Sequence, residues 1–136
     1  MNQILNSAFR SIHSLGEKKT GTHALTGISE QRSSLAASLL LSERKGASLI
    51  ITPSPGRAER LGEDFAFFAK KRVYVFPEDE SRFLRFEAKS HQYLEMRLAA
   101  MTALARNEDC VVIASAAATL KYLPKKERFM RDVLTF

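Results

Sequence analysis

The sequence predicts an α/β fold, a parallel sheet of about four strands with helices on both faces. Three observations support this prediction. Segments with the apolar spacing of helices alternate with short strand-like segments along the 136 residues. The strand-like segments are mostly continuous apolar runs, which is typical of strands buried on both faces of a parallel sheet. Residues that cap helices stand at the starts of the helical segments.

The N-terminal elements are a helix, a loop, a strand and a second helix. Apolar residues at helical spacing predict the first helix over 2–15. Residues 16–21 have the composition of a loop, and residues 22–26 are predicted to form the first strand. Ser29 is the expected N-cap of a helix that reaches about Lys45 and is ended by Gly46.

Two further strands follow, with a helix between them. Residues 47–52 read Ala-Ser-Leu-Ile-Ile-Thr and predict a strand that is buried on both faces and ended by Pro53. Ser54 and Pro55 are an N-cap and a first-turn proline, so a helix is expected from there through Lys70. Residues 73–76, Val-Tyr-Val-Phe, predict the next strand.

The C-terminal half repeats this alternation. After a polar connection over 78–89, a long helix is expected from Ser90 to about Arg106. Residues 110–114 predict a fourth strand, and Ser115 is the expected cap of a short helix through about Leu123. A last strand is expected to begin at Asp132. Ligands of such sheets bind beyond the carboxyl ends of the strands.

Composition argues against several classes of protein. The sequence has no run of about eighteen apolar residues and no secretory signal, so no membrane-spanning segment is predicted. The single cysteine, Cys110, excludes an internal disulfide, fits a reducing cytoplasm and is expected to be a small buried hydrophobe. His13, His23 and His91 are widely separated with no second ligand at metal spacing, so no metal site is predicted.

The net charge of +6 is concentrated near the C-terminus. The stretch from Lys121 to Arg131 holds five Lys and Arg residues against the single Glu127. Such a cluster is either an electrostatic footprint for nucleic acid or a solvated basic surface. No aromatic stacking pattern accompanies it, which favours the solvated surface and leaves its role open.

The segment that begins at Gly27 has the length and frame of the phosphate-binding loop G-x-x-x-x-G-K-[ST]. Gly27 and Ser34 match the first and last positions of the motif. Arg32 replaces its second glycine, and Ser33 replaces the lysine that reaches the β- and γ-phosphates. Glu30 adds a negative charge where an anion would lie. We therefore expect a degenerate phosphate loop that is inactive in nucleotide binding.

A second interpretation of this segment needs no phosphate chemistry: a strand, a turn and a helix capped by Ser29. Capping also explains the serines at the other expected helix starts without invoking a nucleophile. The acidic pair Asp79-Glu80 lies in a loop and lacks a phosphate-binding lysine, so we interpret it as a solvated turn. Arg97 follows Tyr93 by one helical turn and either packs its stem beside that ring and pairs with a nearby carboxylate, or faces a neighbouring domain.

Five segments in register resemble the N-terminal region of the bacterial transcription-repair coupling factors (Mfd). They are the degenerate loop followed by LIITPSPGRAERL at 49–61, YVFPEDE at 74–80, RLAAMTAL at 97–104 and VVIASAAATL at 111–120. The resemblance covers about residues 20–136. That region is similar to the first domain of the damage-recognition subunit of the excision nuclease (UvrB). The resemblance therefore implies a degenerate P-loop NTPase-like fold, like domain 1a of UvrB.

The resemblance also implies a function. In UvrB the corresponding loop is an intact ATP site, whereas the coupling factors have lost ATP binding here and use ATP and magnesium in a separate motor. The chain is then a non-catalytic interaction or scaffold domain of a cytoplasmic protein. Its implied partners are other domains of the same chain, with RNA polymerase and DNA bound by the parent protein. UvrA would bind a following domain.

The resemblance divides the chain into three parts. They are a helix and loop over 1–21, the degenerate α/β domain over 22–129, and the truncated start of a following inserted domain over 130–136. The connection over 78–89 departs from UvrB, whose counterpart carries a long aromatic hairpin that clamps DNA. A dozen residues with Phe83 and Phe86 as the only aromatics are too few for such a hairpin, which favours the coupling factors.

Two other functions stay open. The first is a working ATP- or DNA-binding domain of a UvrB-like or helicase-like protein, which the retained Gly27 and Ser34 and the basic stretch support. The second is an unrelated small α/β enzyme, for which the sequence offers no catalytic constellation.

Overall fold

A computed structural model describes residues 10, 12, 14, 20–42, 44–68, 70–78 and 87–133, with the backbone alone for 87–90. The helix predicted over 2–15 lies outside these residues except for Arg10, Ile12 and Ser14, which have helical backbone. Residues 79–86 of the predicted polar connection, which include Phe83, lie outside them too.

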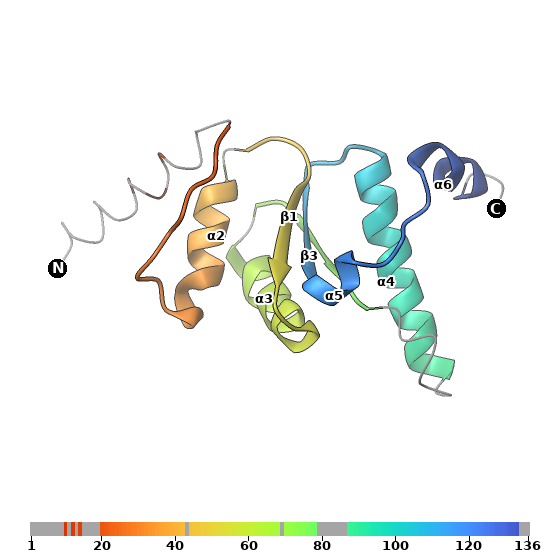
Figure 1. Cartoon of the computed structure of the whole chain (residues 1–136), viewed down its shortest axis with the longest axis horizontal. Coiled ribbons are helices and arrows are strands. Elements are labelled where there is room, and N and C mark those ends of the chain that lie inside the picture. Colours follow the sequence, from red (N-terminus) through yellow and green to blue (C-terminus); the bar gives the residue numbers. More distant parts are fainter. Residues whose placement is uncertain are drawn as a thin grey trace.

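The centre of the fold is a three-stranded parallel sheet in the order β1-β3-β2 (Figure 1). The strands are β1 (Ser48–Thr52), β2 (Arg72–Phe76) and β3 (Cys110–Ser115). Ile113 of the central strand β3 pairs with Ile50 of β1 and Val75 of β2. The predicted parallel α/β class is confirmed, and the predicted number of strands is corrected to three within the described residues.

The missing strand is the one predicted over 22–26. These residues have no regular secondary structure, and each of them is exposed. Leu25 is the only large apolar side chain in the segment, and it remains 41% exposed. A strand with so little to bury gains little from joining a sheet, because sheet stability comes from side-chain packing on its faces. The prediction of a strand here was wrong.

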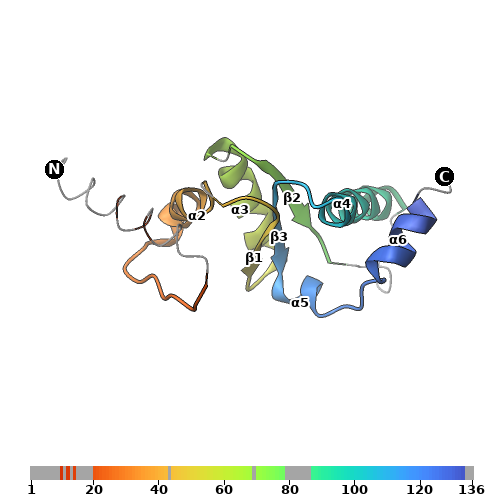
Figure 2. The ribbon, with the colours of Figure 1, turned by 90° about the horizontal axis from the view of Figure 1, so that it is seen from above.

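Helices cover the two faces of the sheet unequally (Figure 2). The structure contains a 3₁₀ turn η1 (Glu30–Arg32) and helices α2 (Ser33–Leu41), α3 (Pro55–Phe68), α4 (Glu87–Ala105), α5 (Ala116–Thr119) and α6 (Lys126–Val133). On one face α3 packs against all three strands, and α2 packs on α3. On the other face α4 packs against β2 and β3, and α6 packs on α4.

Several predicted boundaries need correction. The helix expected from Ser29 to Lys45 is instead the turn η1 followed by α2, which ends at Leu41. Within this described segment the Ser29 side chain makes no capping hydrogen bond. Asp132 and Val133 belong to α6, so the strand predicted to begin at Asp132 is wrong for these two residues. The starts predicted at Pro55 for α3 and at Ser115 for the helix after β3 are confirmed.

Two apolar clusters hold the sheet between its helices. Under α3, the cluster consists of Ala58, Phe65, Val111 and Ile113. Under α4 it consists of Phe76, Ala100, Ala103, Cys110, Val112, Ala114 and Ala118. Side chains of β3 alternate between these clusters, which is why each of its residues is buried. Burying each large aliphatic side chain contributes about 2–3 kcal/mol to folding.

The edge strand β1 does not follow the prediction of burial on both faces. Leu49 and Ile51 are 56% and 57% exposed, whereas Ile50 between them packs against the cluster under α3. In register, Leu49 lies beside Val112 and Ile51 beside Ala114, on the face that carries α4. Because α4 packs against β2 and β3, the β1 part of this face stays open.

Candidate phosphate-loop site

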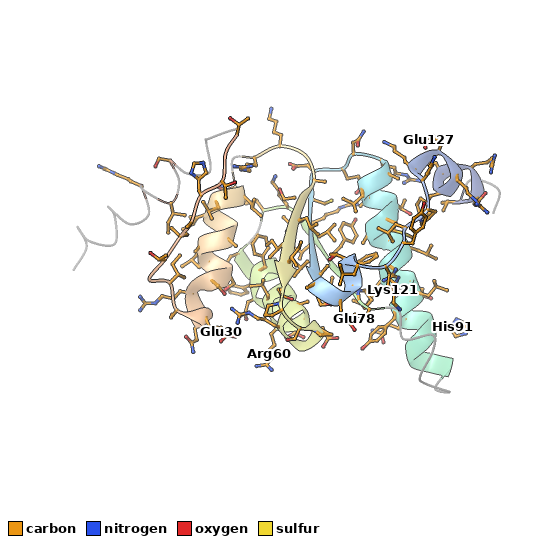
Figure 3. All side chains as sticks on the ribbon, in the orientation of Figure 1. Glu30, Arg60, Glu78, His91, Lys121 and Glu127 are labelled. Atoms are coloured by element: carbon orange, nitrogen blue, oxygen red, sulfur yellow. The ribbon has the colours of Figure 1, made fainter. Side chains whose placement is uncertain are left out.

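The degenerate loop lies beyond the carboxyl end of β1, whereas the sequence placed it after the strand predicted over 22–26. A cavity of about 510 Å³ opens there between η1 and the first turns of α3. Its lining consists of Glu30, Gln31, Ser33, Pro53, Ser54, Gly56, Arg57, Arg60, Leu61 and Asp64. Figure 3 shows Glu30, in the turn η1, and Arg60, on α3, on the same side of the molecule.

Only two of the five predicted loop residues line this cavity. Glu30 and Ser33 do so, whereas Gly27, Arg32 and Ser34 are not part of its lining. Gly27 has a φ of +79°, the left-handed conformation that glycine adopts without strain. Ser34, the counterpart of the metal-binding hydroxyl, is 3% exposed at the start of α2. The loop thus turns as glycine permits, but its hydroxyl is packed away.

Two backbone donors of the loop are already in use. The Arg32 N–H donates to the Ser29 carbonyl over 3.0 Å, and the Ser33 N–H donates to the Glu30 carbonyl. The Ser33 hydroxyl also donates to the Glu30 carbonyl, at 2.6 Å. A phosphate loop needs its N–H groups free and converging on the anion. In this loop the 3₁₀ turn satisfies two of them, those of Arg32 and Ser33, internally.

An ion pair crosses the cavity. The Arg57 guanidinium on α3 lies 2.9 Å from the Glu30 carboxylate. Arg60 and Asp64, one turn and two turns further along α3, also line the cavity. The two arginines and the two carboxylates of the lining give it no formal net charge. The Glu30 carboxylate therefore already pairs with Arg57 in this cavity. With the lysine of the motif replaced by Ser33, the residues that line this cavity do not fit a nucleoside triphosphate with magnesium.

A second polar cluster, which was not predicted from the sequence, lies at the carboxyl ends of β2 and β3. The Ser115 hydroxyl donates to Oε1 of Glu78 at 2.6 Å and accepts a bond from the Ala118 N–H at 3.1 Å. Ser115 is 1% exposed. Its capping role was predicted correctly, but its contact with Glu78 was not. Both residues come at the ends of apolar runs. Because the carboxyl ends of neighbouring parallel strands meet at one edge, this position could have predicted that Ser115 and Glu78 lie close together.

Arg97 belongs to the same edge of the sheet. Its guanidinium lies 4.1 Å from the centroid of the Phe76 ring, and it donates to the Pro77 carbonyl at 2.7 Å. The sequence left open packing beside Tyr93 with a carboxylate partner or contact with a neighbouring domain, and the contacts described here, with Phe76 and Pro77, lie within the domain. The ring it covers is that of Phe76 at the end of β2. This contact ties α4 to the end of β2 by charge and by hydrogen bonding.

Two residues at the amino edge of the sheet have perturbed pKa values. Lys71 forms an ion pair with Asp109 at 2.7 Å and donates to the Arg44 carbonyl. Hydrogen bonding from Lys71 holds the pKa of Asp109 below its ordinary value of 3.8. Burial raises the pKa of the neighbouring Cys110 thiol, which keeps it protonated and unreactive at neutral pH. The prediction of a buried structural cysteine is confirmed.

The remaining predicted candidates are scattered. His23 and His91 are exposed, and His13, Asp79 and Glu80 lie outside the described residues. Among the residues with known placement, no three His, Cys, Asp or Glu side chains gather where they could hold a metal ion. The helices described here include none that is both long and apolar enough to cross a membrane.

The basic stretch from Lys121 to Arg131 forms an exposed surface over the α5–α6 connection and the start of α6. Arg128 and Arg131 lie 3.9 and 3.7 Å from the carboxylate of Asp132. Tyr122 stands among these cations and is 94% exposed. The stretch is therefore a solvated basic surface that presents one aromatic ring.

Comparison of the chain with protein-family models, with curated proteins and with solved structures finds no match.

Proposed function

We propose that this chain is a non-catalytic interaction domain of a larger protein of the transcription-repair coupling type. The observation that carries the proposal is the Glu30–Arg57 ion pair at 2.9 Å, which lies in the cavity beside the degenerate loop. The N–H groups of Arg32 and Ser33 are committed to the turn. A loop that retains Gly27 but uses these N–H groups within its own turn supports a domain that acts by binding other domains through its surface.

The proposal assigns the enzymatic activity to the parent protein. That protein would be an ATP-dependent DNA translocase of helicase type, with ATP and magnesium bound in a separate motor. It would displace stalled RNA polymerase and recruit the nucleotide-excision machinery through UvrA in the bacterial cytoplasm. The part of the chain described here would support the neighbouring domains and would not itself hydrolyse nucleotide.

Calorimetric titration with ATP and magnesium tests the proposal. The wild-type chain should release no binding heat, because it lacks a loop lysine. Such a lysine stabilises the bound phosphates by roughly several kcal/mol. The double variant Arg32→Gly, Ser33→Lys should gain binding if the loop can open its N–H groups. Glu30→Gln serves as the matched control, since it removes the competing carboxylate without adding a cation. Micromolar binding by the wild type would overturn the proposal.

A second candidate, DNA binding by the domain itself, is favoured by Tyr122 and the cations around it. An exposed ring can stack on an unpaired base while lysines neutralise phosphates. Fluorescence anisotropy with a labelled single strand distinguishes the two functions. Binding that weakens with salt and is lost in Tyr122→Ala and Lys125→Glu would support this candidate, and absence of binding at low salt would exclude it.

A further inference from the structure

A second hollow lies beside α2, and its lining is mostly apolar. It measures about 440 Å³, and its apolar lining consists of Leu25, Ile28, Ala36, Ala37 and Leu40. In Figure 1 the segment that precedes η1 runs alongside α2, and the hollow is formed where these two segments meet. Leu25 lines the hollow and is still 41% exposed. The hollow therefore leaves apolar surface uncovered among the described residues.

The polar groups that line this hollow already have partners. They belong to Glu30, Ser33 and Arg57. The Glu30 carboxylate pairs with Arg57 at 2.9 Å, and the Ser33 hydroxyl donates to the Glu30 carbonyl at 2.6 Å. A charged occupant would find these two charges already paired with each other, whereas an uncharged apolar segment would leave the ion pair undisturbed. The lining thus favours an uncharged apolar occupant.

Residues 1–9 of the same chain have this chemistry, since they contain no Asp, Glu, Lys or Arg. One face of the helix predicted over 2–15 carries the apolar residues Ile4, Leu5, Ala8, Phe9 and Ile12. The opposite face carries the polar residues Gln3, Asn6, Arg10 and Ser14. The described residues of this segment agree with that division, because Ile12 is half-buried whereas Arg10 and Ser14 are exposed.

A helix of this length needs an apolar surface to pack on. Isolated helices shorter than about 12–15 residues are marginal in water, and helices in proteins are stabilised mostly by packing their apolar face. The hollow lies within reach of this segment. The chain between residues 9 and 20 can span up to about 35 Å when extended. The nine residues of α2 extend over only about 14 Å.

We propose that residues 1–9 dock with their apolar face in the hollow between α2 and residues 25–28 of the same chain. This contact goes beyond the proposed function and does not depend on it. Glu30, Ser33 and Arg57 line both this hollow and the cavity of the degenerate loop, so the docked segment lies beside the ion pair of that loop. The N-terminal segment then belongs to the α/β domain and is not a separate part of the chain.

A nitroxide label at position 3 of the whole chain tests this contact. Gln3→Cys places the label on the polar face of the predicted helix, and Cys110 stays unlabelled because it is buried. In ¹H–¹⁵N spectra, the amide signals of residues 25, 28, 37 and 40 should lose most of their intensity until the nitroxide is reduced. Signals of α6, which packs on α4 at the other face of the sheet, should keep theirs. Full intensity at residues 25–40 would overturn the proposal.

Substitutions in the labelled chain locate the contact. Phe9→Lys puts a charge on the docking face and should restore the lost intensity. Asn6→Lys is the matched control, because it adds the same charge to the same segment on the opposite face, and it should leave the loss unchanged. Leu25→Lys should act as Phe9→Lys does, without disturbing the sheet, because Leu25 belongs to no helix or strand. Equal spectra for Phe9→Lys and Asn6→Lys would contradict the proposal.

A mixed sample identifies the chain that supplies the segment. Chain that carries ¹⁵N without nitroxide is mixed with chain that carries nitroxide without ¹⁵N. Loss of intensity at residues 25–40 in this mixture would mean that a second copy fills the hollow, which overturns the proposal. Full intensity in the mixture, together with loss in the chain that carries both labels, supports it.

Discussion

The Ser115 hydroxyl and the Glu78 carboxylate are joined by a 2.6 Å hydrogen bond, although the two residues stand 37 positions apart. Ser115 ends β3 and Glu78 follows the end of β2 by two residues. The same hydroxyl accepts the N–H of Ala118 and so caps α5. One buried oxygen atom therefore fixes three elements at the carboxyl edge of the sheet, and the connection after β2 is held against the start of α5.

Replacing Ser115 by alanine should destabilise the fold by about 1–3 kcal/mol, because both the cap and the bond to Glu78 are lost. Chemical denaturation measures the free energy of unfolding. Thr119→Ala is the control, since its exposed hydroxyl bonds only its own helix, to the Ala116 carbonyl. A double-mutant cycle with Glu78→Ala should show coupling of about 1 kcal/mol. Additive effects would mean that the 2.6 Å contact contributes nothing measurable.

Gly62 of α3 packs so closely on β2 that a side chain does not fit. A Cβ built at Gly62 would clash with Cγ2 of Val75. Gly62→Ala should therefore lower the free energy of unfolding by about 1–3 kcal/mol through overpacking, and Val75→Ala in the same chain should relieve part of the clash. A Cβ at Gly56, in the first turn of the same helix, would meet no described atom within 4 Å beyond its chain neighbours and the helix backbone, so Gly56→Ala should be neutral or stabilising. Equal effects of the two substitutions would contradict this account.

Arg97 should stabilise the domain through Phe76 and Pro77 by about 1–2 kcal/mol. Arg97→Met keeps the apolar stem but loses the charge above the ring and the bond to the carbonyl, so its unfolding midpoint should fall. Arg97→Lys keeps the charge without the planar guanidinium and should fall less. Arg106→Met, exposed just beyond α4, is the surface control. A normal midpoint for Arg97→Met would show that the contact is not stabilising.

Acid should weaken the fold partly through Asp109. Its pKa is lowered in the folded state by the hydrogen bond from Lys71, so the ionised carboxylate favours folding. This contribution is present above the unfolded pKa of about 4 and is lost as the pH falls through the lower folded value. Asp109→Asn should therefore be less stable than wild type at pH 7, and the difference should shrink below pH 4 in denaturation series. In a Lys71→Met background the substitution should matter less. A difference that does not vary with pH would contradict the assignment.

Local sequence features predicted the elements that depend on neighbours along the chain. Pro55 begins α3 and Ser115 caps α5 as expected, because a proline ring and a serine hydroxyl act on their own turn. The apolar runs at β1, β2 and β3 predicted the strands and their parallel class. The same local reasoning failed at residues 22–26, where strand formation needed a partner and a buried face that the fold does not supply.

The candidate site divides in the same way. The sequence by itself determined that the loop after Gly27 lacks its lysine and second glycine, since residue identity decides which charges and donors are available. Only the tertiary structure brought Arg57 onto Glu30 and Ser115 onto Glu78, and only it left Leu49 and Ile51 uncovered. These features depend on how segments far apart in the chain come together. They depend on the order β1-β3-β2 and on the position of α4, neither of which is encoded in the spacing of neighbouring residues.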